Sequence, residues 1–272
     1  MSTKDLLRED IGFFDLTTEA LGIADLRGEI TFEPKQEMIL CGSRFVKETL
    51  KELDLESSFL KRDGERVKKG EVFLRCHGRA GDLHALWKVA QNIFEYSSGI
   101  ATYTSDLLGL VEHKISVLTT RKNLPNAKEF MQRSVFCGGG APHRLGTYDS
   151  VLIFSQHLEF LHSSSTLESS FRSLKKRLIE KKIAVEVESF ADASYFADLQ
   201  ADILQCEKMS IDELQKCVLL KQKYPSLVVV ATGGINHTNI KEYALTGVDG
   251  IVTSSPYHAK PLDVKVRMRR VV

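Results

Sequence analysis

The sequence predicts an α/β protein in which a smaller domain precedes an α/β barrel. From Ile115 onward, short apolar runs rich in β-branched residues alternate with helical segments. This alternation favours a parallel sheet, and closure into a barrel is its simplest form. Before Ile115 the chain shows short strand-like runs, glycine turns and helices, which together indicate a small α/β sandwich. A chain of 272 residues has room for both domains.

We place the boundary between the domains after residue 104. Residues 1–104 would form the sandwich and residues 105–264 the barrel, while the tail 265–272 would return to the first domain. The strands expected in the barrel are 115–120, 150–154, 183–188, 201–206, 227–231 and 250–253. The helices expected between them are 127–135, 164–181, 192–199, 210–222 and 237–245.

Two helical regions are expected ahead of the barrel. Ser43 can cap a helix that runs to Leu53. Apolar residues at helical spacing predict a long helix over 83–97, interrupted at Gly99 and resumed over 102–113.

The composition is that of an ordinary globular protein, and we expect it in the cytoplasm. Hydrophobic residues make up 43% of the chain and charged residues 27%. The net charge of +1 gives no reason to expect nucleic acid or an anionic membrane as a partner, so local clusters must supply any affinity for anions. No apolar run approaches the roughly 18 residues of a membrane span, and the polar N-terminus does not resemble a signal peptide.

The cysteines predict reduced thiols and no bound metal. They are odd in number, scattered along the chain and without CxxC spacing, which is unlike a zinc site or a disulfide framework. The five residues are Cys41, Cys76, Cys137, Cys206 and Cys217.

The stretch from Ile115 to His157 carries two pairs of basic residues. Arg121-Lys122 follows the first strand, and His143-Arg144 follows the glycine run 138–140. In α/β barrels the carboxyl ends of the strands are where ligands bind. Arg and Lys bind phosphate and carboxylate through charge-assisted hydrogen bonds, so a small ligand with several negative charges is expected here.

Two carboxylates lie on one face of a later strand. In the run AVEVE, Glu186 and Glu188 point to one side, and Val185 and Val187 point to the other. If the valines pack against helices, the carboxylates face the barrel lumen. Buried carboxylates need cations, a metal or ligand hydroxyls, and a structural ion pair with the barrel cations is the alternative to a functional role.

Two loops after neighbouring late strands predict a phosphate site. Thr232, Gly233 and Gly234 follow one apolar strand, and Ser254 and Ser255 follow the next. Glycines between a strand and a helix expose backbone N–H groups to an anion. Two such loops on late strands form the usual phosphate site of barrel enzymes.

Several motifs occur together and in order along the chain. They are TRK-x-x-P, GGG-x-x-HR-x-G and D-x-x-LI-x-x-x-H, flanked by SSGIATYT, VEVES, TGGI and TGVDGI. This pattern resembles the quinolinate phosphoribosyltransferase family, also called carboxylating nicotinate-nucleotide pyrophosphorylases. Within it, the chain is most similar to the ModD branch, whose genes lie beside molybdate transporters. The resemblance covers nearly the whole chain.

The resemblance implies a type II phosphoribosyltransferase fold. This fold has a partial, open TIM-like barrel of about seven strands, a smaller N-terminal α/β sandwich, and a homodimer or larger assembly with shared active sites. The implied reaction moves ribose 5-phosphate from phosphoribosyl pyrophosphate, with Mg²⁺, to a ring nitrogen of a small heteroaromatic acid. Glu186 would contact the ribose and Lys122 the donor phosphate. The residues expected to hold the acceptor are Arg121, His143, Arg144 and, from the partner subunit, Lys88.

Two departures from the family pattern concern the acceptor. The lysine of the family's LIKDNH motif falls on Phe154, and the acidic residue of its LDN motif falls on Cys206, which Glu207 follows. Quinolinate carries two carboxylates, so loss of a cation removes possible pairing. Phe154 offers an apolar face to a flat ring instead. We therefore expect an acceptor other than quinolinate, with Phe154 and Cys206 in its site.

Three alternatives remain open from sequence. The first is true quinolinate phosphoribosyltransferase activity, with another cation in place of the lysine. The second is a non-catalytic sensor of an anion or nucleotide, linked to molybdate uptake, in which Cys206 marks lost chemistry. The third is an aldolase that uses Lys122 as its Schiff base, with the neighbouring Arg121 lowering the lysine pKa.

Overall fold

The computed structural model describes residues 3–161 and 164–271, which divide into two units. Unit 1 comprises Met1–Ser105, Asn123–Gly139 and Pro256–Val272, and unit 2 comprises Asp106–Lys122 and Gly140–Ser255. Residues 123–139 and 256–264, which the sequence interpretation placed in the barrel, group with unit 1 instead.

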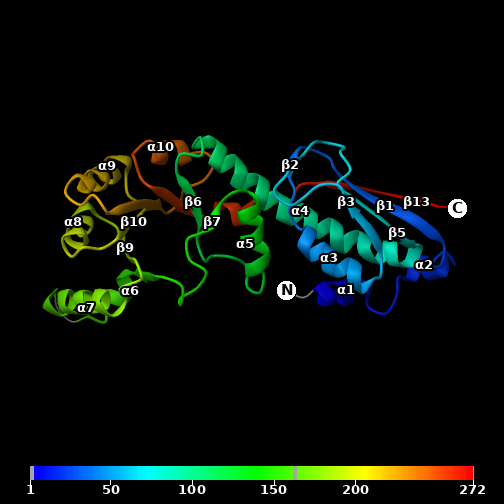
Figure 1. Ribbon diagram of the computed structural model, residues 1–272, viewed down its shortest axis with the longest axis horizontal. Helices are drawn as coiled ribbons and strands as arrows, with labels where there is room; N and C mark the ends of the chain where they lie inside the picture. The colour runs from blue at the N-terminus through cyan, green and yellow to red at the C-terminus, as the bar shows by residue number, and fades with distance from the viewer. Residues whose placement is uncertain (1–2, 162–163, 272) are drawn as a thin grey trace. The chain divides into compact units, whose positions relative to one another are not determined.

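Unit 1 is built on a four-stranded sheet in the order β13-β1-β5-β3 (Figure 1). Its paired strands all run antiparallel. The strands are β1 (Arg27–Pro34), β3 (Glu56–Phe59), β5 (Leu74–Arg79) and β13 (Val264–Arg270). The C-terminal strand β13 thus lies beside the first strand of the chain.

One face of this sheet packs on helices α3 (Ser43–Glu52) and α4 (Ala80–Leu110). Alternate residues of the strands, such as Ile30 and Phe32, are fully buried there. The ring of Phe94 from α4 meets the ring of Phe32 at 5.9 Å and that of Phe73 at 4.9 Å. This aromatic cluster forms the centre of the unit 1 core.

Helix α4 is continuous, so the interruption expected at Gly99 is wrong. A Cβ at Gly99 would collide with the carbonyl oxygen of Lys260. The glycine therefore lets the C-terminal segment pass directly against the helix, and it does not break the helix.

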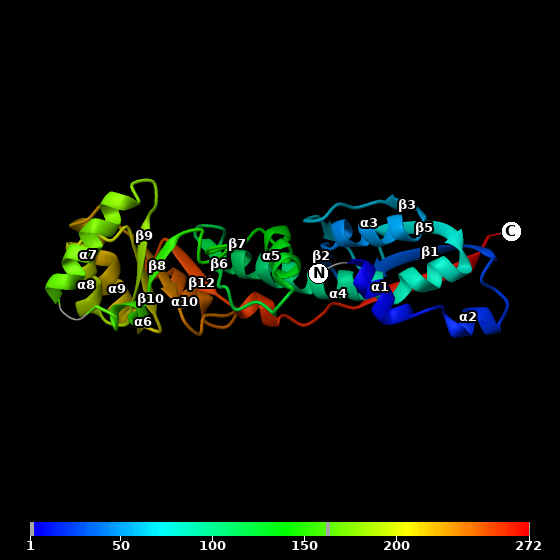
Figure 2. The ribbon, with the colours of Figure 1, turned by 90° about the horizontal axis from the view of Figure 1, so that it is seen from below.

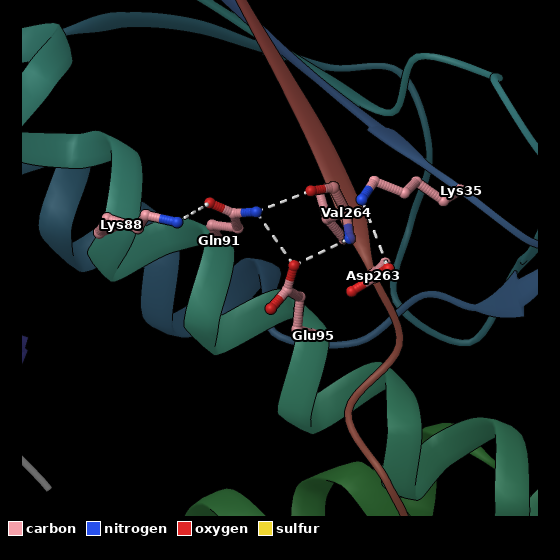
Figure 3. A network of polar contacts seen from close by, with 6 residues as sticks. All are labelled: Lys35, Lys88, Gln91, Glu95, Asp263 and Val264. Atoms are coloured by element: carbon pink, nitrogen blue, oxygen red, sulfur yellow. Dashed lines mark hydrogen bonds and ion pairs between the residues drawn. The ribbon is translucent and has the colours of Figure 1, made fainter.

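The C-terminal segment is also tied to α4 by polar side chains (Figure 3). The Gln91 amide donates to the carbonyl of Val264 at 2.8 Å and to Glu95 at 3.0 Å. The same Glu95 carboxylate accepts from the N–H of Val264 at 2.9 Å. The remaining elements of unit 1 are α1 (Thr3–Ile11), α2 (Leu16–Ala20), β2 (Met38–Ile39), β4 (Arg66–Val67) and α5 (Lys128–Cys137).

Unit 2 is a curled half-barrel of seven parallel strands in the order β7-β6-β12-β11-β10-β9-β8, which confirms the predicted fold class. The strands are β6 (Ser116–Thr119), β7 (Ala141–Pro142), β8 (Val151–Ile153), β9 (Ile183–Val187), β10 (Ile203–Glu207), β11 (Val228–Thr232) and β12 (Gly250–Thr253). Six of them are the strands expected from sequence. The seventh, β7, has only two residues, too few to show a strand pattern.

Helices cover the outer face of the half-barrel (Figure 2). They are α6 (Ser155–Leu158), α7 (Ser164–Arg177), α8 (Phe190–Asp198), α9 (Ile211–Leu219) and α10 (Ile240–Ala244), with the 3-10 turn η1 (Leu220–Gln222). The 3-10 turn η2 (Ser255–His258) begins at the last residue of unit 2 and continues in unit 1. Val185 and Val187 are buried on the helix side of β9, and Glu186 points to the lumen between them. Within the two described ranges, no helix has the length and apolar character needed to cross a membrane.

Candidate active site

Carboxylates line the lumen at the ends of β9 and β10. Gln205 pairs in register with Glu186, and its amide donates to Glu186 Oε2 at 2.7 Å. Glu207 lies two residues further along β10, on the same face. Burial raises the pKa of Glu186, and the nearby charges of Glu207 and Glu188 raise it further, while the Gln205 hydrogen bond opposes the shift. The free site therefore favours a positively charged neighbour for Glu186.

The other end of the Gln205 amide lacks a partner. Its Oε1 atom is buried and accepts no hydrogen bond from the residues that the structure describes. A buried acceptor of this kind costs free energy unless a donor satisfies it.

Cys206 does not face this site, so the expectation that it contacts substrate is wrong. Its side chain is 1% exposed and lies near Cys217 of α9, on the helix side of the sheet. Interaction with the Cys217 thiol, followed by burial, raises the pKa of the Cys206 thiol. The acidic side chain at this point of the lumen belongs to Glu207. Strand alternation from Gln205 is the sequence signal that identifies Glu207.

Arg144 is a buried cation at the other side of the lumen. It is 7% exposed, and its guanidinium carbon lies 5.3 Å from the centre of the Phe154 ring. Burial lowers the pKa of Arg144, the charge of Arg121 lowers it further, and Glu186 acts in the opposite direction. Arg121 and Arg144 are thus close enough to repel each other, a repulsion that an anionic ligand would relieve.

The remaining basic residues differ in exposure. Lys122 is exposed and acts electrostatically on Glu186. This exposure does not provide the desolvation that an aldolase lysine needs. His143 donates its backbone N–H to the carbonyl of Thr119 at 2.9 Å. Burial, and secondarily Arg144, lowers the pKa of His143, so its imidazole is neutral at physiological pH.

A cavity of about 580 Å³ opens beside these cations, within unit 2. Arg121 and Arg144 supply positive charge to its wall, and the stacked rings of Phe154 and His157 lie there with centroids 5.8 Å apart. The rest of the wall is largely apolar, with contributions from Leu152, Leu158, Leu161, Leu167, Phe171 and Leu174. Such a cavity suits a flat, mostly apolar ligand with one anionic group.

The glycine loop after β11 has the geometry of an anion site. Gly233 and Gly234 have φ values of +92° and +72°, a conformation that favours glycine. A Cβ at Gly233 would lie 2.9 Å from Glu207 Oε1, so the loop also needs glycine for space. Among the residues that the structure describes, the N–H groups of Gly233 and Gly234 have no acceptor. Thr232, the last residue of β11, is buried.

The loop after β12 is fastened to this glycine loop. Thr253 Oγ1 donates to the carbonyl of Ile235 at 2.6 Å and accepts from the N–H of Ser255 at 3.0 Å. Ser254 and Ser255 are both half-buried. The two predicted phosphate loops are therefore neighbours, as the sequence interpretation requires.

Lys88 lies in unit 1, on an exposed part of α4 (Figure 3). Its Nζ donates to Gln91 Oε1 at 3.1 Å and lies 5.5 Å from the Trp87 ring. Its proposed place in the active site of a partner subunit stays a prediction.

Family models match both parts of the chain. The model of the quinolinate phosphoribosyl transferase C-terminal domain matches residues 100–267, and that of the N-terminal domain matches residues 15–98. The chain belongs to the quinolinate phosphoribosyltransferase family. It is thus a phosphoribosyltransferase of this family, whose curated members carry pyrophosphorylase names.

Curated members of the family resemble the chain over nearly its whole length. A protein of Pasteurella multocida provisionally named pyrophosphorylase ModD is 32% identical, with 98% of this chain and 96% of that protein covered. A Methanothermobacter thermautotrophicus protein provisionally named nicotinate-nucleotide pyrophosphorylase (carboxylating) is 30% identical, with 98% and 97% covered. The solved structure of the Francisella tularensis nicotinate-nucleotide pyrophosphorylase superposes with a TM-score of 0.90 at 26% identity, covering 98% of this chain and 94% of that chain.

Proposed function

We propose that the protein transfers ribose 5-phosphate from phosphoribosyl pyrophosphate to a ring nitrogen of a small heteroaromatic acid other than quinolinate. The observation that carries this proposal is the pairing of two unlike regions in unit 2. One is a lumen edge with Glu186, Glu207 and anion-binding loops, and the other is a largely apolar cavity with Arg121 and Arg144 in its wall. A charged sugar donor suits the first region, and a flat acid suits the second.

The donor is held through its phosphate and its sugar. The N–H groups of Gly233 and Gly234, with the hydroxyls of Ser254 and Ser255, bind the 5-phosphate. Lys122 contributes a point charge to the donor phosphates. A ribose hydroxyl donates to the Glu186 carboxylate, which the Gln205 amide orients through its 2.7 Å hydrogen bond to Oε2.

Glu186 stabilises the positive charge that develops on the sugar as pyrophosphate leaves. Its carboxylate is partly buried, where electrostatic interactions are stronger than in water. The raised pKa of Glu186 means that the ionised form is strained in the free site and is relieved when a cation develops beside it. This is an interaction made more strongly in the transition state than in the ground state.

The side chains of this edge fit a magnesium-bound donor. Glu186, Glu188 and Glu207 provide carboxylate oxygens, the ligand type that Mg²⁺ prefers, and they repel one another in the free protein. When bound with pyrophosphate, Mg²⁺ supplies neutralisation of the leaving group. Glu186 and Glu207 would hold it directly or through water.

The acceptor enters the cavity with its carboxylate towards Arg121 and Arg144. The neutral imidazole of His143 can hydrogen-bond to the acceptor without adding charge. Phe154 presents a ring where a second acceptor carboxylate would need a cation. We include in the proposal a homodimer in which Lys88 of the partner subunit adds a further cation to the acceptor.

The test uses calorimetry and pyrophosphate release. Phosphoribosyl pyrophosphate with Mg²⁺ should bind, and at about 100 times its Kd it should stabilise the fold by about 2.7 kcal/mol. Lys122→Met should weaken this binding, and Lys216→Met, which removes an exposed lysine of α9, should not. Pyrophosphate should appear with a monoanionic heteroaromatic acid and much more slowly with quinolinate. Donor binding without pyrophosphate release from any acid would favour a non-catalytic sensor, and no binding at millimolar donor would refute the proposal.

A further inference from the structure

Two cysteines that are far apart in sequence come together in unit 1. The Sγ atoms of Cys41 and Cys137 and a carboxylate oxygen of Asp63 all lie within 4.8 Å of one another. Cys41 follows β2, Asp63 lies between β3 and β4, and Cys137 is the last residue of α5. Cysteine spacing along the chain gave no indication of this cluster, because the fold alone creates it.

Cys41 is held in place by buried serines of α4. Its N–H donates to Ser98 Oγ at 3.0 Å, and its carbonyl accepts from Ser97 Oγ at 2.5 Å. Both serines are fully buried, and the Cys41 side chain is 1% exposed. These hydrogen bonds fix the backbone from which the thiol projects, and such fixed ligands favour metal binding.

Cys137 is fixed by the glycine that follows it. A Cβ at Gly138 would collide with the carbonyl oxygen of Ala101 and would lie 2.7 Å from Thr104 Cβ. The end of α5 therefore lies directly against α4, with Cys137 packed beside Ile39 and Cys41. The first glycine of the run 138–140 thus serves this contact.

Asp63 faces solvent and is oriented by a backbone donor. The N–H of Ser43, the first residue of α3, donates to Asp63 Oδ1 at 3.1 Å. This bond orients the carboxylate and leaves its second oxygen available. Asp63 and Ser43 also line an open groove of about 560 Å³, which gives the cluster a path from solvent.

We propose that Cys41, Cys137 and Asp63 bind one thiophilic divalent cation of the zinc class, with water as the fourth ligand. Zinc takes sulfur at about 2.3 Å and carboxylate oxygen at about 2.0–2.2 Å in a tetrahedron, so its two sulfurs lie about 3.8 Å apart. The 4.8 Å limit of this cluster requires only a small contraction of side chains whose backbones are already fixed. The bound cation would join the β2–α3 segment, the β3–β4 connection and α5.

Charge in the cluster determines how cation binding at the proposed site would depend on pH. Interaction with the neighbouring Cys137 thiol, together with burial, raises the pKa of Cys41 well above its ordinary value, and the charge of Asp63 adds to the shift. Two thiolates beside a carboxylate repel one another unless a cation joins them. Cation binding would therefore displace the two thiol protons, so affinity should rise with pH.

The experiment adds Co²⁺ and then Zn²⁺ to the reduced full-length protein. We expect one Co²⁺ per chain, with a near-ultraviolet thiolate-to-cobalt charge-transfer band and the visible bands of a tetrahedral ion, both abolished by one equivalent of Zn²⁺. Cys137→Ser should lower zinc affinity at least 100-fold in competition with a chromophoric chelator. Asp63→Asn, which keeps an acceptor for the Ser43 N–H, should lower it about 10-fold. Cys76→Ala removes a buried cysteine of unit 1 outside the cluster and should retain wild-type affinity.

Zinc should also raise the Tm of the wild-type protein and of Cys76→Ala, and leave that of Cys137→Ser unchanged. The proposal is overturned if cobalt binds without a thiolate band, or if Cys137→Ser binds zinc as tightly as wild type. Recovery of Cys41 and Cys137 as a disulfide, with no cobalt uptake after its reduction, would overturn it as well.

Discussion

Replacing Phe154 with lysine tests the acceptor site most directly. In the family pattern a lysine stands at this position, and here the Phe154 ring lies under the guanidinium of Arg144 at 5.3 Å. Phe154→Lys should therefore exchange a favourable cation–ring contact for repulsion between two cations. We expect the free protein to become less stable and the binding of a dianionic acid to become stronger.

The magnitudes follow from that distance. Loss of the contact between Arg144 and the ring costs about 0.5–2 kcal/mol. Two unit charges 5.3 Å apart repel by about 0.8 kcal/mol in water and about 3 kcal/mol at an effective dielectric constant of about 20. Since the lysine side chain can turn towards solvent, we expect a destabilisation of about 1–3 kcal/mol, which is a Tm reduction of several degrees.

A second carboxylate on the bound acid should make the added lysine favourable, because it gives the new cation a partner. A hydrogen bond between charged partners contributes about 1.5–3 kcal/mol, which corresponds to about 10- to 150-fold in Kd. Quinolinate should gain this factor with Phe154→Lys, while nicotinate, with one carboxylate, should gain little. Phe154→Leu is the matched control, because it removes the ring without adding a charge, and quinolinate should bind it no better than wild type.

Isothermal titration of quinolinate and nicotinate against the three proteins measures these differences. Steady-state turnover of quinolinate by the wild-type protein completes the test. Tight quinolinate binding and efficient turnover by wild type, unchanged in Phe154→Lys, would refute the reasoning. The chain would then act on quinolinate with a different cation in place of the missing lysine.

Three further predictions concern the lumen and its loops. Glu186→Gln should lower kcat by about 100-fold or more. The pKa of Glu186 is raised above its ordinary 4.5, so the ionised carboxylate destabilises the folded protein as pH rises. Glu186→Gln should therefore have a higher Tm than wild type at about pH 8 and lose that advantage below about pH 4.5. Glu207→Gln should lower donor turnover at least 10-fold, whereas Cys206→Ala should stay within a few-fold of wild type in the same assay. Gly233→Ala should lower the free energy of unfolding in urea by about 1–3 kcal/mol and abolish donor binding measured by calorimetry. Gly247 has a φ of +89° and lies outside the site, so Gly247→Ala should lower stability by a similar amount and keep donor binding.

The fold could be predicted from sequence where elements are long enough to show a period. The six longer strands of the half-barrel each carry several apolar residues between turn signals, and all six are present. The two-residue strand β7 has no period to detect. Gly99 shows a second limit of prediction from sequence. This glycine suggested a helix break, but it is needed because the carbonyl of Lys260 packs against the helix there, a contact that depends on tertiary structure.

The site shows the same division between local and long-range information. The alternation in AVEVE placed Glu186 in the lumen, and the structure agrees. Motif matching placed the acidic position of β10 one residue too early, on Cys206. Two neighbours show which face of the sheet each side chain of β10 occupies. Gln205 hydrogen-bonds to Glu186 on the lumen side, and Cys206 lies near Cys217 on the helix side. Neither contact can be read from β10 alone.

In the proposed reaction, the positions of charge in unit 2 would allow acceptor specificity to change while the donor site is kept. The carboxylates and glycine loops that suit the donor lie on β9, β10 and β11 and in the loops that follow β11 and β12. The cavity proposed for the acceptor is formed mainly by β8, α6 and α7, with Arg121 and Arg144 as its cations. The charge of Glu186 acts to raise the pKa of Arg144, so the two regions are coupled electrostatically. Because Phe154 lies in the cavity wall and not in the loops after β11 and β12, we expect its substitution to change which acid binds and to leave the hydrogen bonds of those loops in place.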